Sequence, residues 1–304
     1  MSANDQTQMT ALAQASAAAH PVPDRGHVNY YTSDGELQSL LALYLPADLH
    51  AHLQPYFERM GELAGGAVDD WALEADRNPP TLEMRSRAGK EQQRIVKHPA
   101  YVEMEKIAFQ QFGLAAISHR EDMLGWKGKM PPIVKYALTY LFVQSEFGLC
   151  CPLSMTDSLT RTLKKYGAPE LVNKYLPKLL AMDFDSGVQG SMFMTEQAAG
   201  SDIANTLTMA YPQEDGTWRL YGEKWFCSNP DADFGMVLAR VDGGPPGMKG
   251  ISLFLLPRIK DDGGTNHYHI VRLKDKLGTR SMASGEIRME GAVAYLVGEQ
   301  GRGF

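Results

Sequence analysis

Residues 183–228 read DFDSGVQGSMFMTEQAAGSDIANTLTMAYPQEDGTWRLYGEKWFCS, and within them the pattern of the sequence changes. Before this stretch, apolar residues recur every three or four positions, which is the period of an amphipathic helix. Within and after it, β-branched and aromatic residues alternate with polar ones between Gly, Asp and Pro turns, as they do in strands. The turn at 183–187 therefore predicts a boundary between a helical domain over residues 29–184 and a β-domain over residues 185–304.

The helical period is clearest in residues 37–45 and 133–141, where Leu, Ile, Tyr and Ala side chains share one helical face. Proline and glycine breakers divide the segment, so we expect an N-terminal all-α domain of about six or seven helices. Residues 1–28 are rich in Ala but lack the basic start and apolar core of a signal peptide. We expect them to form a disordered tail.

The β-domain shows five clear strands, each bounded by turn residues. They are expected at residues 206–211, 217–227, 234–241, 251–257 and 267–273. Short strands at this spacing predict an antiparallel β-barrel or sandwich. Together with the helical domain, this gives an α+β fold.

Composition and charge exclude several classes of protein. The 304 residues carry 30 Lys and Arg against 36 Asp and Glu, a net charge of −6, so no global positive field attracts nucleic acid or anionic lipid. Three cysteines, of which Cys150 and Cys151 are adjacent, suit a reducing compartment. No apolar run approaches the roughly 18 residues of a membrane span. We therefore expect a cytoplasmic protein without a membrane partner.

Generic motifs offer few sites, since the sequence has no Walker A loop, dinucleotide-binding glycine motif or nucleophile elbow. His267 and His269 would point to one face of a strand, but no third ligand lies near them, so we expect no metal site. The basic stretch over residues 85–97 could hold phosphate on one helical face, although a solvated helix face is the favoured interpretation. Cys150 and Cys151 are interpreted as core thiols because no cation flanks them.

Residues 192–202, MFMTEQAAGSD, combine the features of a loop that binds a polar ligand. Thr195 and Ser201 supply hydroxyls, Glu196 and Asp202 supply carboxylates, and the small residues between them let the backbone approach a ligand closely. On its own the segment also fits an ordinary Asx or Ser/Thr turn.

Two further motifs follow this loop, YGEKWFCSN at residues 221–229 and KDKLGTRS at residues 274–281. In this order and spacing, the three segments resemble the middle β-domain of acyl-CoA dehydrogenases, FAD enzymes that oxidise the Cα–Cβ bond of acyl-CoA thioesters. The variants are most similar to the AidB-type branch, adaptive-response flavoproteins linked to alkylation stress. NPP at 78–80 and HPA at 98–100 also resemble the helical domain of that branch. The resemblance extends from about residue 28 to residue 304.

The resemblance implies FAD as the cofactor and gives roles to the residues of the first motif. The backbone around Met192 and Met194 and the hydroxyl of Thr195 would hold the pyrimidine edge of the flavin. Ser201 would lie near the pyrophosphate and would also contact the bound thioester. Donors at such positions stabilise the negative charge that an isoalloxazine gains when it accepts hydride.

The second motif would supply the other face of the site. Phe226 replaces the family's more usual tryptophan against the flavin ring, Cys227 follows it in the cofactor-binding segment, and the hydroxyl of Ser228 would approach flavin N5. Trp225 would alternate to the opposite face and lie in the core. One departure concerns substrate chemistry, because Gly285 stands where many of these dehydrogenases have an arginine.

In the family, a C-terminal four-helix bundle supplies the catalytic glutamate and most of the oligomer interface. That bundle is absent from the 304 residues, and the glycine-rich end GEQGRGF at residues 298–304 is typical of a loop that leads into another element. We therefore expect the catalytic base beyond residue 304, no catalytic residue and no dehydrogenase activity in this chain alone, and weak binding of FAD. The longer protein would be a homo-oligomer that oxidises an acyl-CoA.

Two alternatives remain open. The first is an AidB-type protective flavoprotein of the alkylation stress response, which would bind DNA through the missing C-terminal domain. The second is an interaction module that has kept the fold and lost the flavin, because fold alone does not fix function.

Overall fold

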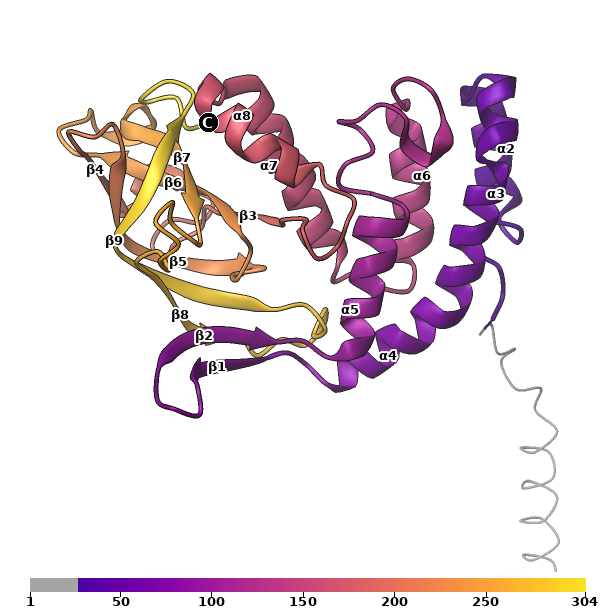
Figure 1. The fold of residues 1–304 in the computed structure, drawn as a ribbon, viewed down its shortest axis with the longest axis horizontal. Helices are drawn as coiled ribbons and strands as arrows, with labels where there is room; N and C mark the ends of the chain where they lie inside the picture. The colour runs from indigo at the N-terminus through magenta and orange to yellow at the C-terminus, as the bar shows by residue number, and fades with distance from the viewer. Residues whose placement is uncertain (1–26) are drawn as a thin grey trace, which may run out of the picture.

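The computed structural model describes residues 27–304, so nearly all of the tail predicted over residues 1–28 lies outside the described residues. Figure 1 shows a helical half and a β half packed side by side, with α7 and α8 next to the strands. The boundary predicted at residues 184 and 185 falls between α8, which ends at Leu179, and β3, which begins at Gly190.

Seven α-helices form within the described residues, all of them in the predicted helical domain. They are α2 (Gly35–Tyr44), α3 (Ala47–Leu63), α4 (Asp69–Arg77), α5 (Pro99–Glu105), α6 (Pro132–Val143), α7 (Cys150–Tyr166) and α8 (Pro169–Leu179), with short π and 3₁₀ turns η1 (Ala64–Val68), η2 (Lys106–Gln111) and η3 (Met123–Gly125). The side chain of Asp34 caps α2 by accepting from the Leu37 N–H at 2.8 Å. Helices α5, α6 and α8 begin with proline, whose missing N–H costs nothing at that position.

A β-hairpin interrupts the helical half, formed by β1 (Thr81–Arg85) and β2 (Glu91–Val96). The prediction of a helical basic stretch over residues 85–97 is therefore wrong. Gly89 adopts a positive φ of 79° in the connecting turn, which favours glycine. Ile95 packs into the core of the β-domain, so long-range burial decides the structure of this segment.

The β half is a closed barrel. Its strands are β3 (Gly190–Phe193), β4 (Met209–Pro212), β5 (Trp218–Ser228), β6 (Phe234–Val241), β7 (Ile251–Pro257), β8 (Tyr268–Leu273) and β9 (Ser284–Val297), with 3₁₀ turns η4 (Ile203–Asn205) and η5 (Gly247–Gly250). Strands β6, β4, β5, β9 and β7 pair in that order, and β7 pairs again with β6, while β3 lies on β6 and β8 on β9. The predicted α+β fold with a barrel is confirmed. Two pairs differ from the antiparallel expectation, because β3 and β4 both run parallel to β6.

The two halves share parts of their hydrophobic cores. Met282, which precedes β9, packs into the core of the helical half, and Ile95 of the hairpin packs into the barrel. A third cluster joins α7 and α8 to the strands. No four-helix bundle follows β9 within residues 27–304, and no described helix has the length and apolar character of a membrane span.

Candidate functional site

The end of β3 and the end of β5 lie next to each other, and they carry most of the predicted site residues. The hydroxyl of Ser191 donates to the carbonyl oxygen of Ser228 at 2.6 Å. The N–H of Trp225 donates to the carbonyl oxygen of Thr195 at 2.8 Å. The fold thus brings together the first two motifs, which are separate in sequence.

A bulge in β5 sets the direction of its last side chains. The register between β5 and β9 shifts between Lys224 and Cys227, and Phe226 has a positive φ of 54°. Because a bulge interrupts the alternation of a strand, Trp225 is half-buried and Phe226 is 53% exposed. The prediction that Trp225 lies in the core is therefore wrong, whereas the ring of Phe226 is available to a ligand.

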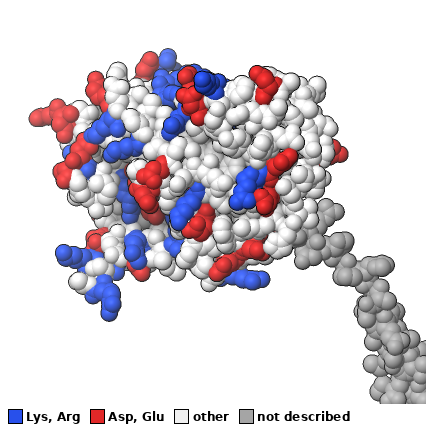
Figure 2. All heavy atoms as spheres, turned by 45° about the vertical axis from the view of Figure 1, so that its right-hand side comes forward, with Lys and Arg blue, Asp and Glu red and all other residues white. Residues whose placement is uncertain are grey.

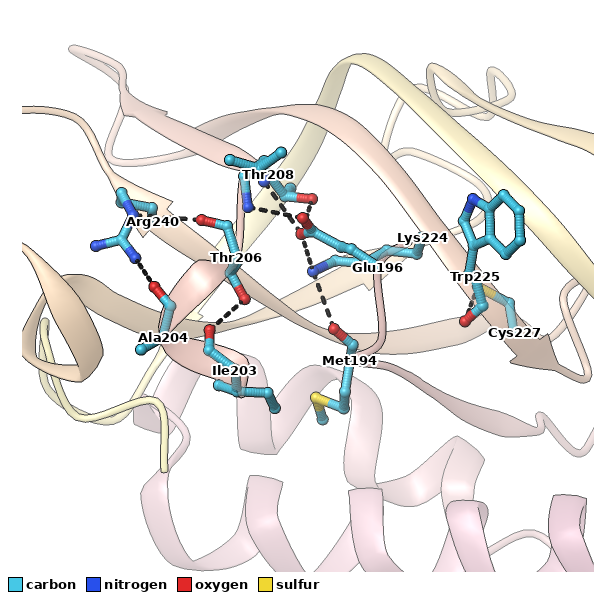
Figure 3. Close-up of polar contacts among 11 residues, drawn as sticks. Met194, Glu196, Ile203, Ala204, Thr206, Thr208, Lys224, Trp225, Cys227 and Arg240 are labelled. Carbon is cyan, nitrogen blue, oxygen red and sulfur yellow. Dashed lines mark hydrogen bonds and ion pairs between the residues drawn. The ribbon is translucent and has the colours of Figure 1, made fainter. Parts of the chain in front are cut away.

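The side chain of Cys227 is fully buried in the barrel core, with its sulfur 3.9 Å from the carbonyl oxygen of Trp225 (Figure 3). Burial raises the pKa of this thiol, which keeps it neutral. The expectation that Cys227 binds the cofactor is corrected for its side chain, because that side chain packs inward and does not reach the surface.

Glu196 and Lys224 form a buried ion pair behind the site (Figure 3). Nζ of Lys224 lies 2.6 Å from Oε1 of Glu196, and the two side chains are 0% and 6% exposed. The same carboxylate accepts from the Leu207 N–H at 2.7 Å, the Thr208 N–H at 3.1 Å and the Thr208 hydroxyl at 2.6 Å. Lys224 also donates to the carbonyl oxygen of Met194 at 3.2 Å. The pair therefore ties both ends of the loop between β3 and β4 to β5.

Burial is the largest influence on the pKa of both partners. For Glu196 it acts to raise the pKa, but the charge of Lys224 and the four hydrogen bonds prevail, so the pKa lies below its usual value. For Lys224, burial lowers the pKa and the carboxylate only partly opposes it. A carboxylate with this many donors stays ionised at neutral pH, so charge as well as geometry holds the loop.

Arg240 of β6 holds the middle of the same loop (Figure 3). Its guanidinium donates to the carbonyl oxygens of Ala204 at 2.7 Å and Thr206 at 3.3 Å. The hydroxyl of Thr206 in turn donates to the carbonyl oxygen of Ile203 at 2.8 Å. The loop backbone is thus fixed before any ligand arrives.

Three predicted hydroxyls are left without an internal partner. Within residues 27–304, the hydroxyls of Thr195, Ser201 and Ser228 make no hydrogen bond, whereas those of Ser191 and Thr208 nearby are bonded inside the protein. Thr195 and Ser228 are half-buried on adjoining segments, and Ser201 is exposed farther along the loop. These hydroxyls are free to bind a polar ligand.

The two methionines of the first motif pack at the boundary between the barrel and the helices. Met192 and Met194 are half-buried and pack against the cluster that joins α7 and α8 to the barrel.

Next to Trp225 is a hollow of about 360 Å³, lined also by Glu196, Gln197, Ala198, Leu207 and Glu223. The loop and Trp225 therefore border this hollow, while Thr195, Ser201, Phe226 and Ser228 are not among the residues that line it.

The other candidates from the sequence lie elsewhere. His269 contacts Gln93 of the hairpin at 2.7 Å, and the described residues contain no group of three or more His, Cys, Asp or Glu side chains able to hold a metal. The basic residues of the hairpin are exposed, and Figure 2 shows basic and acidic side chains interspersed over one face of the molecule. Cys151 packs against the helical core, while Cys150 lies 3.8 Å from the Ser154 hydroxyl.

The fold defines a class of protein in which a helical domain precedes a closed β-barrel, and here free hydroxyls and an exposed aromatic ring lie beside the loop after β3. Residues 21–186 match the adaptive response protein AidB N-terminal domain, and residues 191–292 match the middle domain of acyl-CoA dehydrogenases. The chain belongs to the acyl-CoA dehydrogenase family, with an N-terminal domain of the AidB type.

Individual relatives agree with this membership. Acyl-CoA dehydrogenase family member 11 of Caenorhabditis elegans is 30% identical over 283 residues, covering 90% of this chain and 45% of the relative. The putative acyl-CoA dehydrogenase AidB of Escherichia coli (strain K12) is 33% identical over 241 residues, covering 76% and 42%. The chain thus spans less than half the length of these curated relatives.

Solved structures share the fold. The apo form of Bd2924 superposes with a TM-score of 0.83 at 34% identity, covering 92% of this chain and 56% of that one. Caenorhabditis elegans ACDH-11 in complex with C11-CoA gives a TM-score of 0.82 at 29% identity, covering 94% and 49%.

FAD is the cofactor that this membership implies, and the residues of the site fit it. Thr195, Ser201 and Ser228 offer hydroxyls without internal partners, which suit the polar edge and the phosphates of the cofactor. Phe226 is 53% exposed, and with the Lys274 ammonium group 3.9 Å from its ring centroid on one face, the rest of the ring is open to a planar ligand.

Proposed function

We propose that the residues described here form the FAD-binding part of an acyl-CoA dehydrogenase that oxidises the Cα–Cβ bond of an acyl-CoA thioester. The observation that carries this proposal is that the unpartnered hydroxyls of Thr195 and Ser228 and the exposed ring of Phe226 lie on adjoining segments, joined by the hydrogen bond from the Trp225 N–H to the Thr195 carbonyl oxygen. A buried ion pair behind these residues supports it, because a site that must recognise a rigid ring benefits from a fixed backbone.

When bound, FAD supplies the acceptor for the hydride that leaves the β-carbon of the substrate. Thr195 and Ser228 would donate hydrogen bonds to the flavin, and the backbone at Met192 and Met194 would hold its pyrimidine edge. Phe226 would pack against the ring and exclude water from it. Ser201 would contact the pyrophosphate and the thioester.

Acyl-CoA is proposed as the substrate class because the similar C. elegans ACDH-11 was solved in complex with C11-CoA. The base that removes the α-proton is expected beyond residue 304, in a longer protein that we expect to be a cytoplasmic homo-oligomer. The AidB-type alternative places its DNA contacts in a domain outside these residues, so it stays a prediction about that longer protein.

Titration of the purified 304-residue chain with FAD, followed by flavin fluorescence and calorimetry, tests the proposal. We expect saturable binding with a dissociation constant of about 10 μM or weaker, because one wall of the cleft holds the cofactor alone. Phe226→Ala should weaken binding about tenfold or more, since a lost aromatic contact and its buried area exceed about 1.4 kcal/mol.

Tyr166→Ala is the matched control, because Tyr166 is also 53% exposed but lies at the end of α7. Its variant should bind FAD like the wild type. Equal affinities of both variants, or an absence of saturable binding by the wild-type chain, would contradict the proposed function.

A further inference from the structure

A cavity of about 160 Å³ lies between the two halves of the protein. The helical half contributes Lys97 and residues 115–116 to its wall, and the β half contributes the turn between β5 and β6, residues 229–233. None of the residues assigned to FAD lines this cavity. Because an apolar protein cavity of about 150 Å³ can hold a benzene molecule, this one has room for a small organic ligand.

Two acceptors on the β5–β6 turn line the cavity without a donor. Asn229 is 3% exposed, and its amide nitrogen donates to the side-chain oxygen of Gln189 at 2.9 Å, but its own side-chain oxygen accepts no hydrogen bond within residues 27–304. The carboxylate of Asp231 accepts none there either, and its Oδ1 is fully buried. Buried acceptors are nearly always hydrogen-bonded, and buried charges are paired. The two side chains therefore indicate a donor that the described chain does not supply.

Hydrogen bonds hold this turn in place. The N–H of Asn229 donates to the carbonyl oxygen of Ala283 at 2.9 Å, and the N–H of Ala232 donates to the carbonyl oxygen of Asn229 at 3.0 Å. The N–H of Gln189 donates to the carboxylate of Asp233 at 2.8 Å. The acceptors are thus fixed before a ligand arrives, which lowers the entropic cost of binding.

The cations near the cavity are already engaged. Nζ of Lys97 lies 2.8 Å from Oε1 of Glu105, and the two side chains are 18% and 2% exposed. Arg258 acts on Asp233 only from a distance, because its guanidinium donates to a tyrosine hydroxyl and to a backbone carbonyl oxygen of β2. Within the described chain, no Lys, Arg or His nitrogen lies within 4.0 Å of the carboxylate of Asp231 or Asp233. This end of the cavity therefore favours a positively charged ligand.

Large apolar side chains form another part of the lining. They are Phe109, Leu179, Met182, Phe184 and Val188. An alkyl chain would bury apolar surface against them. A primary ammonium group would supply both the positive charge and the N–H donors that Asn229 and Asp231 lack. A bare metal ion fits less well, because the described residues contain no group of three or more His, Cys, Asp or Glu side chains able to hold one.

We propose that this cavity binds a small organic amine, with its ammonium group at Asn229 and Asp231 and its alkyl chain against the apolar lining. This site is separate from the proposed FAD site and does not depend on it. It gives the protein a second ligand of a different chemical class.

Binding of n-butylammonium to the purified 304-residue chain, followed by ligand-detected NMR at constant ionic strength, tests the inference. We expect a dissociation constant of about 1 mM, which is typical of a ligand with few atoms. n-Butanol keeps the alkyl chain without the charge, and the ammonium ion keeps the charge without the chain. Each should bind at least about tenfold more weakly than n-butylammonium. Equal binding of either compound would overturn the assigned class of ligand.

Asp231→Asn removes the charge and keeps the shape of the side chain, so it should weaken binding of n-butylammonium about tenfold or more. The fold should not change, because Asp231 makes no side-chain hydrogen bond within the described residues. Asp242→Asn is the matched control, since Asp242 is an exposed carboxylate after β6 that does not line the cavity, and this variant should bind like the wild type. Equal affinities of the two variants, or an absence of saturable binding by the wild-type chain, would overturn the inference.

Discussion

Glu196→Gln should destabilise the protein more than the loss of a surface ion pair would. The amide keeps the shape of the carboxylate and can still accept hydrogen bonds, but it removes the charge that faces Lys224 at 2.6 Å. The ammonium group, 0% exposed, would then face only neutral acceptors, the new amide oxygen and the Met194 carbonyl oxygen at 3.2 Å. Removing one partner of a buried pair costs about 3–5 kcal/mol because the other charge stays desolvated.

We take about 3 kcal/mol, since the amide oxygen can still accept from the Thr208 N–H and hydroxyl, although the amide nitrogen cannot accept from the Leu207 N–H. This is a large part of a typical free energy of unfolding of roughly 5–15 kcal/mol. In a chain of this size it should lower the melting temperature by about 6–12 °C. Urea denaturation gives the change in the free energy of unfolding from the shift of the midpoint. An unchanged slope of that free energy against urea concentration would show that neither the folded nor the unfolded state changed in compactness.

The double variant Glu196→Gln with Lys224→Met separates the charge from the shape. Removing the ammonium group as well should recover about 1–2 kcal/mol relative to Glu196→Gln alone, because no unpaired charge remains buried. Glu62→Gln is the control, since Glu62 pairs with Arg59 at the surface, and it should cost less than about 0.5 kcal/mol. The reasoning would be refuted if the double variant lost as much free energy of unfolding as the sum of its two single substitutions. It would also be refuted if Glu196→Gln destabilised the protein no more than Glu62→Gln does.

The same pair predicts a pH dependence with a definite sign. The pKa of Glu196 is lower in the folded protein than its usual value, so the carboxylate stabilises the fold above the unfolded pKa of about 4.3. That contribution is lost as the pH falls below this value toward the folded pKa. The difference in unfolding free energy between wild type and Glu196→Gln should therefore be constant near neutral pH and narrow below about pH 4.

Three further substitutions test how the helical half supports the site. Met282→Ala should cost about 2–4 kcal/mol, because this side chain of the β half is buried in the helical core, and fluorescence-detected unfolding should show the loss. Thr156→Val should cost about 1–3 kcal/mol in urea unfolding, because the Gly190 N–H that donates to the Thr156 hydroxyl at 2.9 Å would stay buried without a partner. Asp157→Asn should leave Lys135, which lies 2.9 Å away, as an unpaired buried cation and cost about 3 kcal/mol. Burial acts to raise the pKa of Asp157, but the hydrogen bonds and charges of His119 and Lys135 prevail and lower it. The ionised carboxylate therefore stabilises the fold, and calorimetry should show that this stabilisation is lost as the pH falls below about 3.9.

The sequence predicted four strands of the barrel to within one residue, two with alternating burial, β5 and β8, and two with nearly continuous burial. The predicted ranges 234–241 and 251–257 coincide with β6 and β7, in which nearly every side chain is buried. By contrast, β9 was not predicted although it pairs with β5, β7 and β8. Gly285 and Gly291 weaken its strand pattern, and Gly291 takes a positive φ of 82° at an irregularity that only the pairing with β5 explains.

The sequence predicted which residue types lie near the candidate site but not the directions of their side chains. The motifs identified Thr195, Phe226 and Ser228, and the fold places all three on adjoining segments. The outward position of Trp225 depends on the bulge, which arises from the register of β5 against β9 and leaves no local signal.

A signal for the buried ion pair was present in the sequence. Lys224 stands at the same alternation phase as the buried Trp218 and Leu220, so a strand with regular alternation directs a charge inward. An inward lysine requires a buried carboxylate, and Glu196 in the first motif is such a group.

The helical half contacts the segments that lead into the candidate site. The site loop leaves β3, whose first N–H is held by Thr156 of α7, and Ser281 before β9 donates to the buried carboxylate of Glu146 at 2.9 Å. Met282 extends this contact into the helical core. Strand β3, which leads into the candidate site loop, and β9, which pairs with β5, are therefore placed by contacts from outside the barrel. A β-domain without the helices would keep the motifs and lose these contacts, so its affinity for FAD should be lower than that of the 304-residue chain.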